Sequence, residues 1–160
     1  MVRFTDAEIS DLLEEPKQLP ADYERSLQVQ QKRTAKQASL DVMGDNGHEF
    51  RIILRQSRLN AMDFSAILAH VPADSHTAFR LRRYNGKTGE HTNSLERERM
   101  DGFHIHFATQ RYQEHGQAED AYAEPTSRYA TLGDAVECLL DDCGFVRPPQ
   151  EQLSLFSEGV

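Results

Sequence analysis

The chain contains no tryptophan, two cysteines and no apolar run long enough to cross a membrane. Without tryptophan and with few clustered aromatic residues, the sequence does not support a platform for stacking single-stranded bases. Cys138 and Cys143 are too few for a disulfide framework, and we interpret them as buried thiols. The start of the chain, residues 1–6, lacks the apolar core of a signal peptide. We therefore expect a cytoplasmic protein with no membrane partner.

The net charge of -8 argues against a general nucleic-acid binder. The charge is uneven, however, because residues 51–87 are rich in cations and residues 114–160 are strongly acidic. The cations of this basic centre are Arg51, Arg55, Arg58, Arg80, Arg82, Arg83 and Lys87. One interpretation is a face that binds anions. The other is a solvated sheet face whose arginines pair with acidic residues of the helices.

Local signals predict a helix at each end of a β-rich centre. Thr5 to Glu8 has the form of a capping box, so we expect a helix over residues 6–15 that ends at Pro16. Thr131 is placed to cap a last helix, and Gly144 is a natural residue to end it. A shorter helical turn is expected over residues 109–115.

The residues between these helices alternate with period two. Strands are expected over residues 48–56, 64–71 and 77–84, with a hairpin turn at residues 44–47. In the third of these, Arg80, Arg82 and Tyr84 are expected to point outward together. Residues 103–107 are expected to form a short edge strand.

These elements together predict an α+β fold. It consists of an antiparallel meander of about four or five strands with an N-terminal helix and C-terminal helices. We assign residues 1–146 to a single domain and residues 147–160 to a flexible tail, because periodicity ends at Pro148 and Pro149.

The densest group of reactive residue types lies between Tyr84 and Tyr112. Within it, His104 and His106 are two residues apart, so on a strand their imidazoles project from the same face. His91 precedes them in a polar, irregular stretch.

Three interpretations of these histidines remain open. In the first, they are the general acid and base of phosphodiester cleavage, with Arg82 and Arg111 holding the phosphate and no metal or cofactor required. In the second, His104 and His106, with His91 or Glu96, bind a divalent metal. In the third, they are surface or half-buried histidines that hold a loop by hydrogen bonds.

Several short runs carry a family resemblance. They are Arg83-Tyr84-Asn85-Gly86, His91-Thr92-Asn93, Gly102-Phe103-His104-Ile105-His106, Arg111-Tyr112 and Ala121-Tyr122-Ala123-Glu124-Pro125. Over about residues 49–145, the chain resembles a set of small uncharacterised bacterial proteins. More distantly, it looks like the TumE type of toxin from bacterial toxin–antitoxin pairs. That resemblance implies cleavage of RNA and an antitoxin protein as partner.

A second resemblance lies at the end of the chain. Residues 152–156 read Gln-Leu-Ser-Leu-Phe, which resembles the pentapeptide that holds many bacterial proteins on the DNA polymerase sliding clamp. In such peptides a Gln, here Gln152, anchors one end, and apolar side chains, here Leu153, Leu155 and Phe156, fill an apolar pocket. The resemblance implies the sliding clamp as a partner. The other interpretation is an amphipathic end that folds back on the domain.

The leading hypothesis from the sequence is a toxin-like protein that cleaves RNA without a metal. His104 and His106 form the acid–base pair, His91 orients them or replaces one, and Arg82 and Arg111 bind phosphate. The alternative is a non-enzymatic adaptor or modulator that binds the sliding clamp through Gln152 to Phe156.

Overall fold

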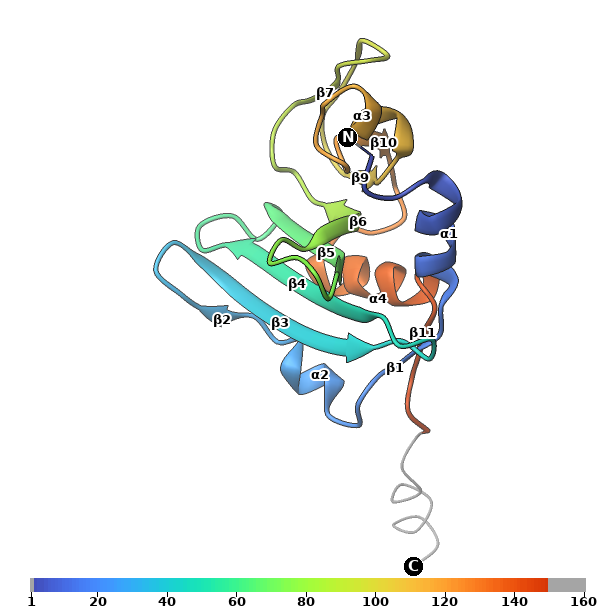
Figure 1. Ribbon diagram of the computed structural model, residues 1–160. Helices are drawn as coiled ribbons and strands as arrows, with labels where there is room; N and C mark the ends of the chain where they lie inside the picture. The colour runs from blue at the N-terminus through green and yellow to red at the C-terminus, as the bar shows by residue number, and fades with distance from the viewer. Residues whose placement is uncertain (1, 150–160) are drawn as a thin grey trace, which may run out of the picture.

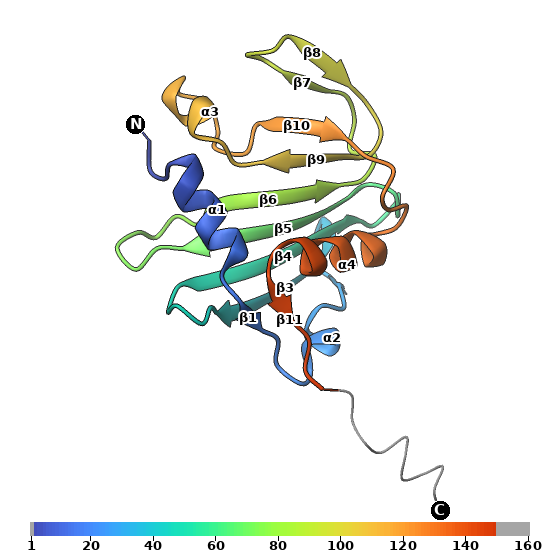
Figure 2. The same ribbon diagram turned by 90° about the vertical axis from the view of Figure 1, so that its right-hand side faces the viewer.

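The structure is a computed structural model that describes residues 2–149. Its centre is a seven-stranded antiparallel sheet in the order β10-β9-β6-β5-β4-β3-β2 (Figure 2). The strands of this sheet are β2 (Gln30–Gln31), β3 (Ala35–Met43), β4 (Glu49–Ser57), β5 (Phe64–Val71), β6 (Phe79–Asn85), β9 (His104–Phe107) and β10 (Tyr122–Pro125). The predicted α+β class is confirmed, with more strands than expected.

The other elements lie around this sheet. Two short strand pairs accompany it: β1 (Lys17–Gln18) with β11 (Phe145–Val146), and β7 (His91–Asn93) with β8 (Glu98–Met100). The helices are α1 (Asp6–Glu14), α2 (Tyr23–Ser26), α3 (Gln110–Glu114) and α4 (Leu132–Asp142). Helices α1 and α4 both cross the same face of the sheet (Figures 1 and 2). Within residues 2–149, no helix is long and apolar enough to cross a membrane.

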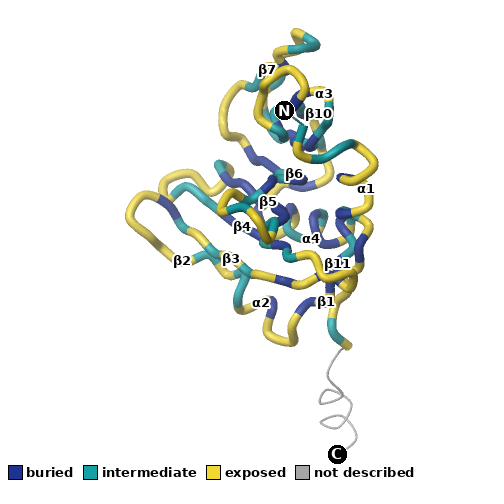
Figure 3. The backbone as a smooth tube through the Cα atoms, in the orientation of Figure 1, coloured by how far each residue is buried: buried dark blue, intermediate teal, exposed yellow. Residues whose placement is uncertain are grey.

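The helix-covered face holds the hydrophobic core. Buried residues concentrate in the centre of the sheet (Figure 3). Along β4 the buried side chains alternate, and Phe50, Ile52 and Leu54 are almost completely inaccessible to solvent. The intervening residues of β4, such as Arg51 and Arg55, lie on the helix-free face and are partly exposed. This alternation confirms the period-two pattern of the sequence.

The helix ends follow the capping signals. Thr5 and Glu8 form the expected capping box at the start of α1. Thr131 accepts a hydrogen bond from the backbone of Asp134 at the start of α4. Gly144 follows this helix with a φ of 76°, where a β-carbon would approach the carbonyl oxygen of Glu15 to 2.7 Å. Glycine is therefore required at this C′ position.

Two predictions about the sheet are wrong. Residues 103–107 were expected at an edge, but β9 is internal because β10 pairs along its outer side. Arg80, Arg82 and Tyr84 do not point outward together, because the register between β5 and β6 shifts at Leu68/Ala69. Such an irregularity reverses the alternation of the strand that carries it.

After the shift, Arg82 lies on the helix-covered face. Its guanidinium stands 4.8 Å from the ring centre of Phe107 and donates to the hydroxyl of Tyr84 at 3.4 Å. That hydroxyl in turn donates to Asp142 of α4 at 2.7 Å. Arg83, the next residue, lies on the opposite face and bonds Asp120 at 3.0 Å.

The basic centre is largely ion-paired. Arg51 bonds Asp41 of β3 at 2.7 Å, and Arg55 bonds Asp63 at 2.9 Å. The pairing supports the solvated-face interpretation, although these acidic partners lie on a neighbouring strand and a loop, not on the helices.

A buried lysine joins the elements at one end of the molecule. The Lys17 side chain is fully buried, and its ammonium donates to the carbonyls of Leu12, Leu13, Glu15 and Cys143 at 2.7 to 3.1 Å. It also lies 4.4 Å from the ring centre of Phe50. Burial lowers the pKa of Lys17 from 10.5 to about 8. The carbonyls that it binds include those at the C-terminal ends of α1 and α4, which have no partner inside their own helices.

Replacing this lysine by a residue of similar length without donors should destabilise the fold. In Lys17→Met the four carbonyls lose their donor, and we expect a loss of about 3 kcal/mol in the free energy of unfolding. Urea unfolding of the variant measures it, with Lys32→Met at an exposed position as the matched control. Equal unfolding midpoints for the wild type and Lys17→Met would show that the ammonium is not needed.

Candidate functional site

Three histidines from two strands, β7 and β9, meet in space. The ring centres of His91 and His106 lie 4.6 Å apart, those of His104 and His106 lie 4.9 Å apart, and those of His91 and His104 lie 5.5 Å apart. We call His91, His104 and His106 the histidine cluster. The structure thus brings together the three residues predicted as catalytic.

The sheet register positions two members of the cluster. His104 and His106 alternate with Ile105, which is part of the hydrophobic core. Across the sheet, His104 pairs with Asn85 of β6, and His106 pairs with Arg83. The cluster therefore lies on the helix-free face, beside Arg83.

The hairpin of β7 and β8 brings His91 to the other two. Asn93, fully buried, donates to the carbonyl of Ala123 at 2.7 Å and accepts from the N–H of the same residue at 2.9 Å. These two bonds attach β7 to β10. The Asn93 oxygen also accepts from Nε2 of His91 at 2.9 Å, which orients that imidazole.

Hydrogen bonds assign the tautomers of His104 and His106. Nδ1–H of His104 donates to the carbonyl of Gly102 at 2.8 Å, and Nδ1–H of His106 donates to the carbonyl of Asp120 at 2.7 Å. A carbonyl only accepts, so in the neutral rings Nε2 carries the lone pair. Nε2 of His104 accepts from the Asn85 amide at 3.4 Å. For Nε2 of His106 no hydrogen-bond partner is found within residues 2–149.

Burial keeps these two imidazoles neutral. His104 is 1% exposed and His106 is 3% exposed, whereas His91 is only half-buried. Burial lowers the pKa of His106 from 6.5 to about 3, and the nearby Arg83 guanidinium adds to this effect. Burial also lowers the pKa of His104. At neutral pH His106 is therefore unprotonated and cannot supply a proton.

The two arginines predicted to bind phosphate, Arg82 and Arg111, have partners other than the histidine cluster. Arg82 pairs across the sheet with Phe107, so its side chain lies on the face opposite His106. Arg111 of α3 forms an ion pair with Glu96, whose other oxygen accepts from the hydroxyl of Tyr112 at 2.5 Å.

The arginine beside the cluster is one that the sequence did not single out. Arg83 lies next to His106 and is held by Asp120, whose carboxylate is also 3.3 Å from Nε of Arg80. Asp120 is fully buried, and its own carbonyl binds His106. The sequence signal for an arginine at this position was the pair Arg82-Arg83. Which of the two lies beside the cluster depends on the register shift between β5 and β6.

The structure also bears on the other reactive groups. Within residues 2–149, no group of three or more His, Cys, Asp or Glu residues is arranged to hold a metal ion. Cys143 is a buried free thiol, as expected, whereas Cys138 is partly exposed. Burial raises the pKa of Cys143 to about 11, so it is not a thiolate nucleophile at neutral pH. The clamp-like residues Gln152, Leu153, Leu155 and Phe156 lie outside the described residues.

The depressed pKa of His106 makes the free energy of unfolding depend on pH. As the pH falls below 6.5, His106 becomes protonated in the unfolded chain, whereas in the folded protein it stays unprotonated down to about pH 3. The free energy of unfolding therefore falls over this range. Each such proton contributes about 1.4 kcal/mol per pH unit. His106→Asn keeps a donor for Asp120 but does not titrate, and we expect a shallower slope. Urea unfolding from pH 7 to pH 4 measures it, and identical slopes would contradict the prediction.

Comparisons with known proteins do not add a family to this geometry. No protein-family model matches the chain, and no match is found among curated proteins or among solved structures. The site must therefore be interpreted from its own residues.

Proposed function

We propose that the protein cleaves RNA at the histidine cluster without a metal ion. The observation that supports this proposal most directly is the meeting of His91, His104 and His106 on the helix-free face. Hydrogen bonds to Asn93, Gly102 and Asp120 fix the three rings, as acid–base groups require.

The reaction that suits these groups is attack by the ribose 2′-hydroxyl on the adjacent phosphorus. A base removes the 2′-hydroxyl proton, the 2′-oxygen forms a bond to phosphorus, and the bond to the 5′-oxygen breaks as an acid protonates that oxygen. The products are a 2′,3′-cyclic phosphate and a 5′-hydroxyl end. Imidazole performs both roles near neutral pH.

The geometry divides the roles differently from the sequence-based hypothesis. His106 is assigned as the base, because its Nδ1–H is bonded to the carbonyl of Asp120 and its Nε2 is left as the accepting atom. His91 is the most exposed ring of the three and is assigned as the acid. His104 orients the other two, and Arg83 takes the charge-stabilising role first given to Arg82 and Arg111.

This proposal keeps an antitoxin as the expected partner. A protein that covers the helix-free face would close the histidine cluster and the ion-paired arginines beside it. The TumE resemblance provides the reason to expect such a partner.

Cleavage of a labelled RNA by the purified protein tests the proposal. We expect cleavage that persists with a chelator, fails on DNA of the same sequence and yields 2′,3′-cyclic phosphate ends. His91→Ala and His106→Asn should each lower the rate by about 10²- to 10⁴-fold, because each removes one proton-transfer group.

Arginine variants make the test specific. Arg83→Gln should slow cleavage, whereas Arg82→Gln, on the opposite face, should not. Circular dichroism checks that each variant is folded. Unchanged cleavage in the His104→Ala/His106→Ala double variant would contradict the assignment, and cleavage abolished by chelator would point to a metal site.

A second candidate function rests on the sequence of the C-terminal peptide. We propose that Gln152 to Phe156 binds the bacterial DNA sliding clamp and tethers the domain to it. An extended peptide laid in an apolar groove is a known recognition mode. Because tethering and catalysis involve different residues, the two functions are compatible.

Binding of the full-length chain to purified sliding clamp tests this second function. We expect Leu155→Ala/Phe156→Ala to lower the affinity at least 10-fold, because two apolar anchors are lost. Leu59→Ala, at a residue 99% exposed in the domain, serves as the control and should bind as the wild type does. Equal affinity of the anchor variant and the wild type, measured by calorimetry, would exclude this peptide as the clamp ligand.

A further inference from the structure

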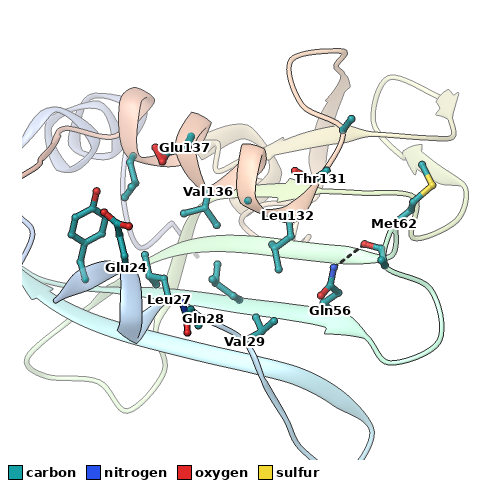
Figure 4. A pocket seen from close by; sticks show the side chains of 16 residues that line it. Glu24, Leu27, Gln28, Val29, Gln56, Met62, Thr131, Leu132, Val136 and Glu137 are labelled. Carbon is teal, nitrogen blue, oxygen red and sulfur yellow. Dashed lines mark hydrogen bonds between the residues drawn. The ribbon is translucent and has the colours of Figure 1, made fainter.

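An apolar groove lies on the helix-covered side of the molecule, between α4 and the segment that contains α2. Its volume is about 770 Å³. Leu132, Val136 and Leu140 of α4 form one wall, and Leu54 of β4 contributes to the base. The opposite wall is formed by Tyr23, Leu27 and Val29. Figure 4 shows Leu27 and Val29 facing Val136 and Leu132 across the groove, with Met62 at one end.

The groove exposes apolar surface that the domain itself does not cover. Met62 is 40% exposed, and Leu27, Val29 and Val136 are only partly buried although they pack against the core. Concave apolar surface of this size is typical of a binding site. The polar side chains at its rim include two acids, Glu24 and Glu137.

The C-terminal segment starts beside this groove. Arg147, just after β11, bonds Glu137 at 2.5 Å and Asp141 at 3.0 Å, and both partners lie on α4. Glu137 is itself a lining residue of the groove. The described chain therefore ends close to the α4 wall.

The chain beyond Arg147 is long enough to enter the groove. Leu153 follows Arg147 by six residues, which span up to about 20 Å when extended. The stretch of α4 from Leu140 to Leu132 is about 12 Å long. Residues 153–156 can therefore reach any part of this wall.

The chemistry of the segment matches the groove. Leu153, Leu155 and Phe156 are apolar, Gln152 and Ser154 are uncharged, and the acids Glu151 and Glu158 flank this stretch. We propose that Leu153, Leu155 and Phe156 dock in this groove in the same chain. The apolar side chains then cover its walls.

Docking gives the C-terminal segment two states. In the docked state Leu153, Leu155 and Phe156 are hidden from other proteins, and the groove is closed. In the released state both become accessible together. Any protein that binds either the segment or the groove must therefore compete with the docked state.

The absence of tryptophan makes the docked state directly measurable. Phe156→Trp in the full-length chain introduces a single indole. We expect its fluorescence to be shifted to shorter wavelength than that of tryptophan in water and to be protected from an aqueous quencher. Both effects should be independent of protein concentration, because the contact is within one chain.

Groove variants complete the test. Adding Val136→Glu to the Phe156→Trp chain should return the emission to that of exposed tryptophan, whereas adding Leu59→Glu, outside the groove, should not. Circular dichroism checks the fold of both. Exposed-type emission in Phe156→Trp alone would overturn the proposal. So would a blue shift that appears only at high concentration, which would indicate a second copy as occupant, or a shift that survives Val136→Glu in a folded chain.

Discussion

The helix layer of this protein depends on one buried ammonium group. Lys17 binds carbonyls at the C-terminal ends of α1 and α4, and its backbone pairs with β11 and with Gly44 in the turn after β3. Glu15, two residues before it, accepts from the backbone of Asn46 and contacts His48 at 2.5 Å. The side chains of Glu15 and Lys17 thus attach both helices to the same hairpin of the sheet. A buried charge is tolerated only when its hydrogen bonds are complete, so the placement of each helix end is tied to the others.

Local features of this fold were predictable, and long-range ones were not. The capping box at Thr5, the cap at Thr131 and the turn at Gly144 depend on residues within four positions of each other, and the structure confirms all three. The internal position of β9 depends on pairing with β10, a strand that ends in Pro125 and has no alternating pattern. The contact of Lys17 with α4 likewise gives no local signal, because the acceptor is the carbonyl of Cys143, far away in the sequence.

The same distinction applies to the candidate site. The spacing of His104 and His106 was enough to place both imidazoles on one face, because alternation along a strand is local. Their burial, and with it the low pKa of His106, arises from a hairpin attached through Asn93 and was not visible in the sequence. The choice of Arg82 over Arg83 failed to place an arginine beside His106 for a related reason. The register shift at Leu68/Ala69 reverses which residues of β6 face each side of the sheet. No residue in β6 signals this shift in the sequence.

The two faces of the sheet separate the proposed activities. The histidine cluster lies on the helix-free face, whereas the apolar groove lies on the helix-covered side, against Leu54 and α4. A protein that occupied the groove would contact α4 and leave His91 open to solvent. A partner that covered the histidines would not contact the groove. Occupation of the groove and occupation of the histidine cluster are therefore sterically independent, because the thickness of the sheet lies between them.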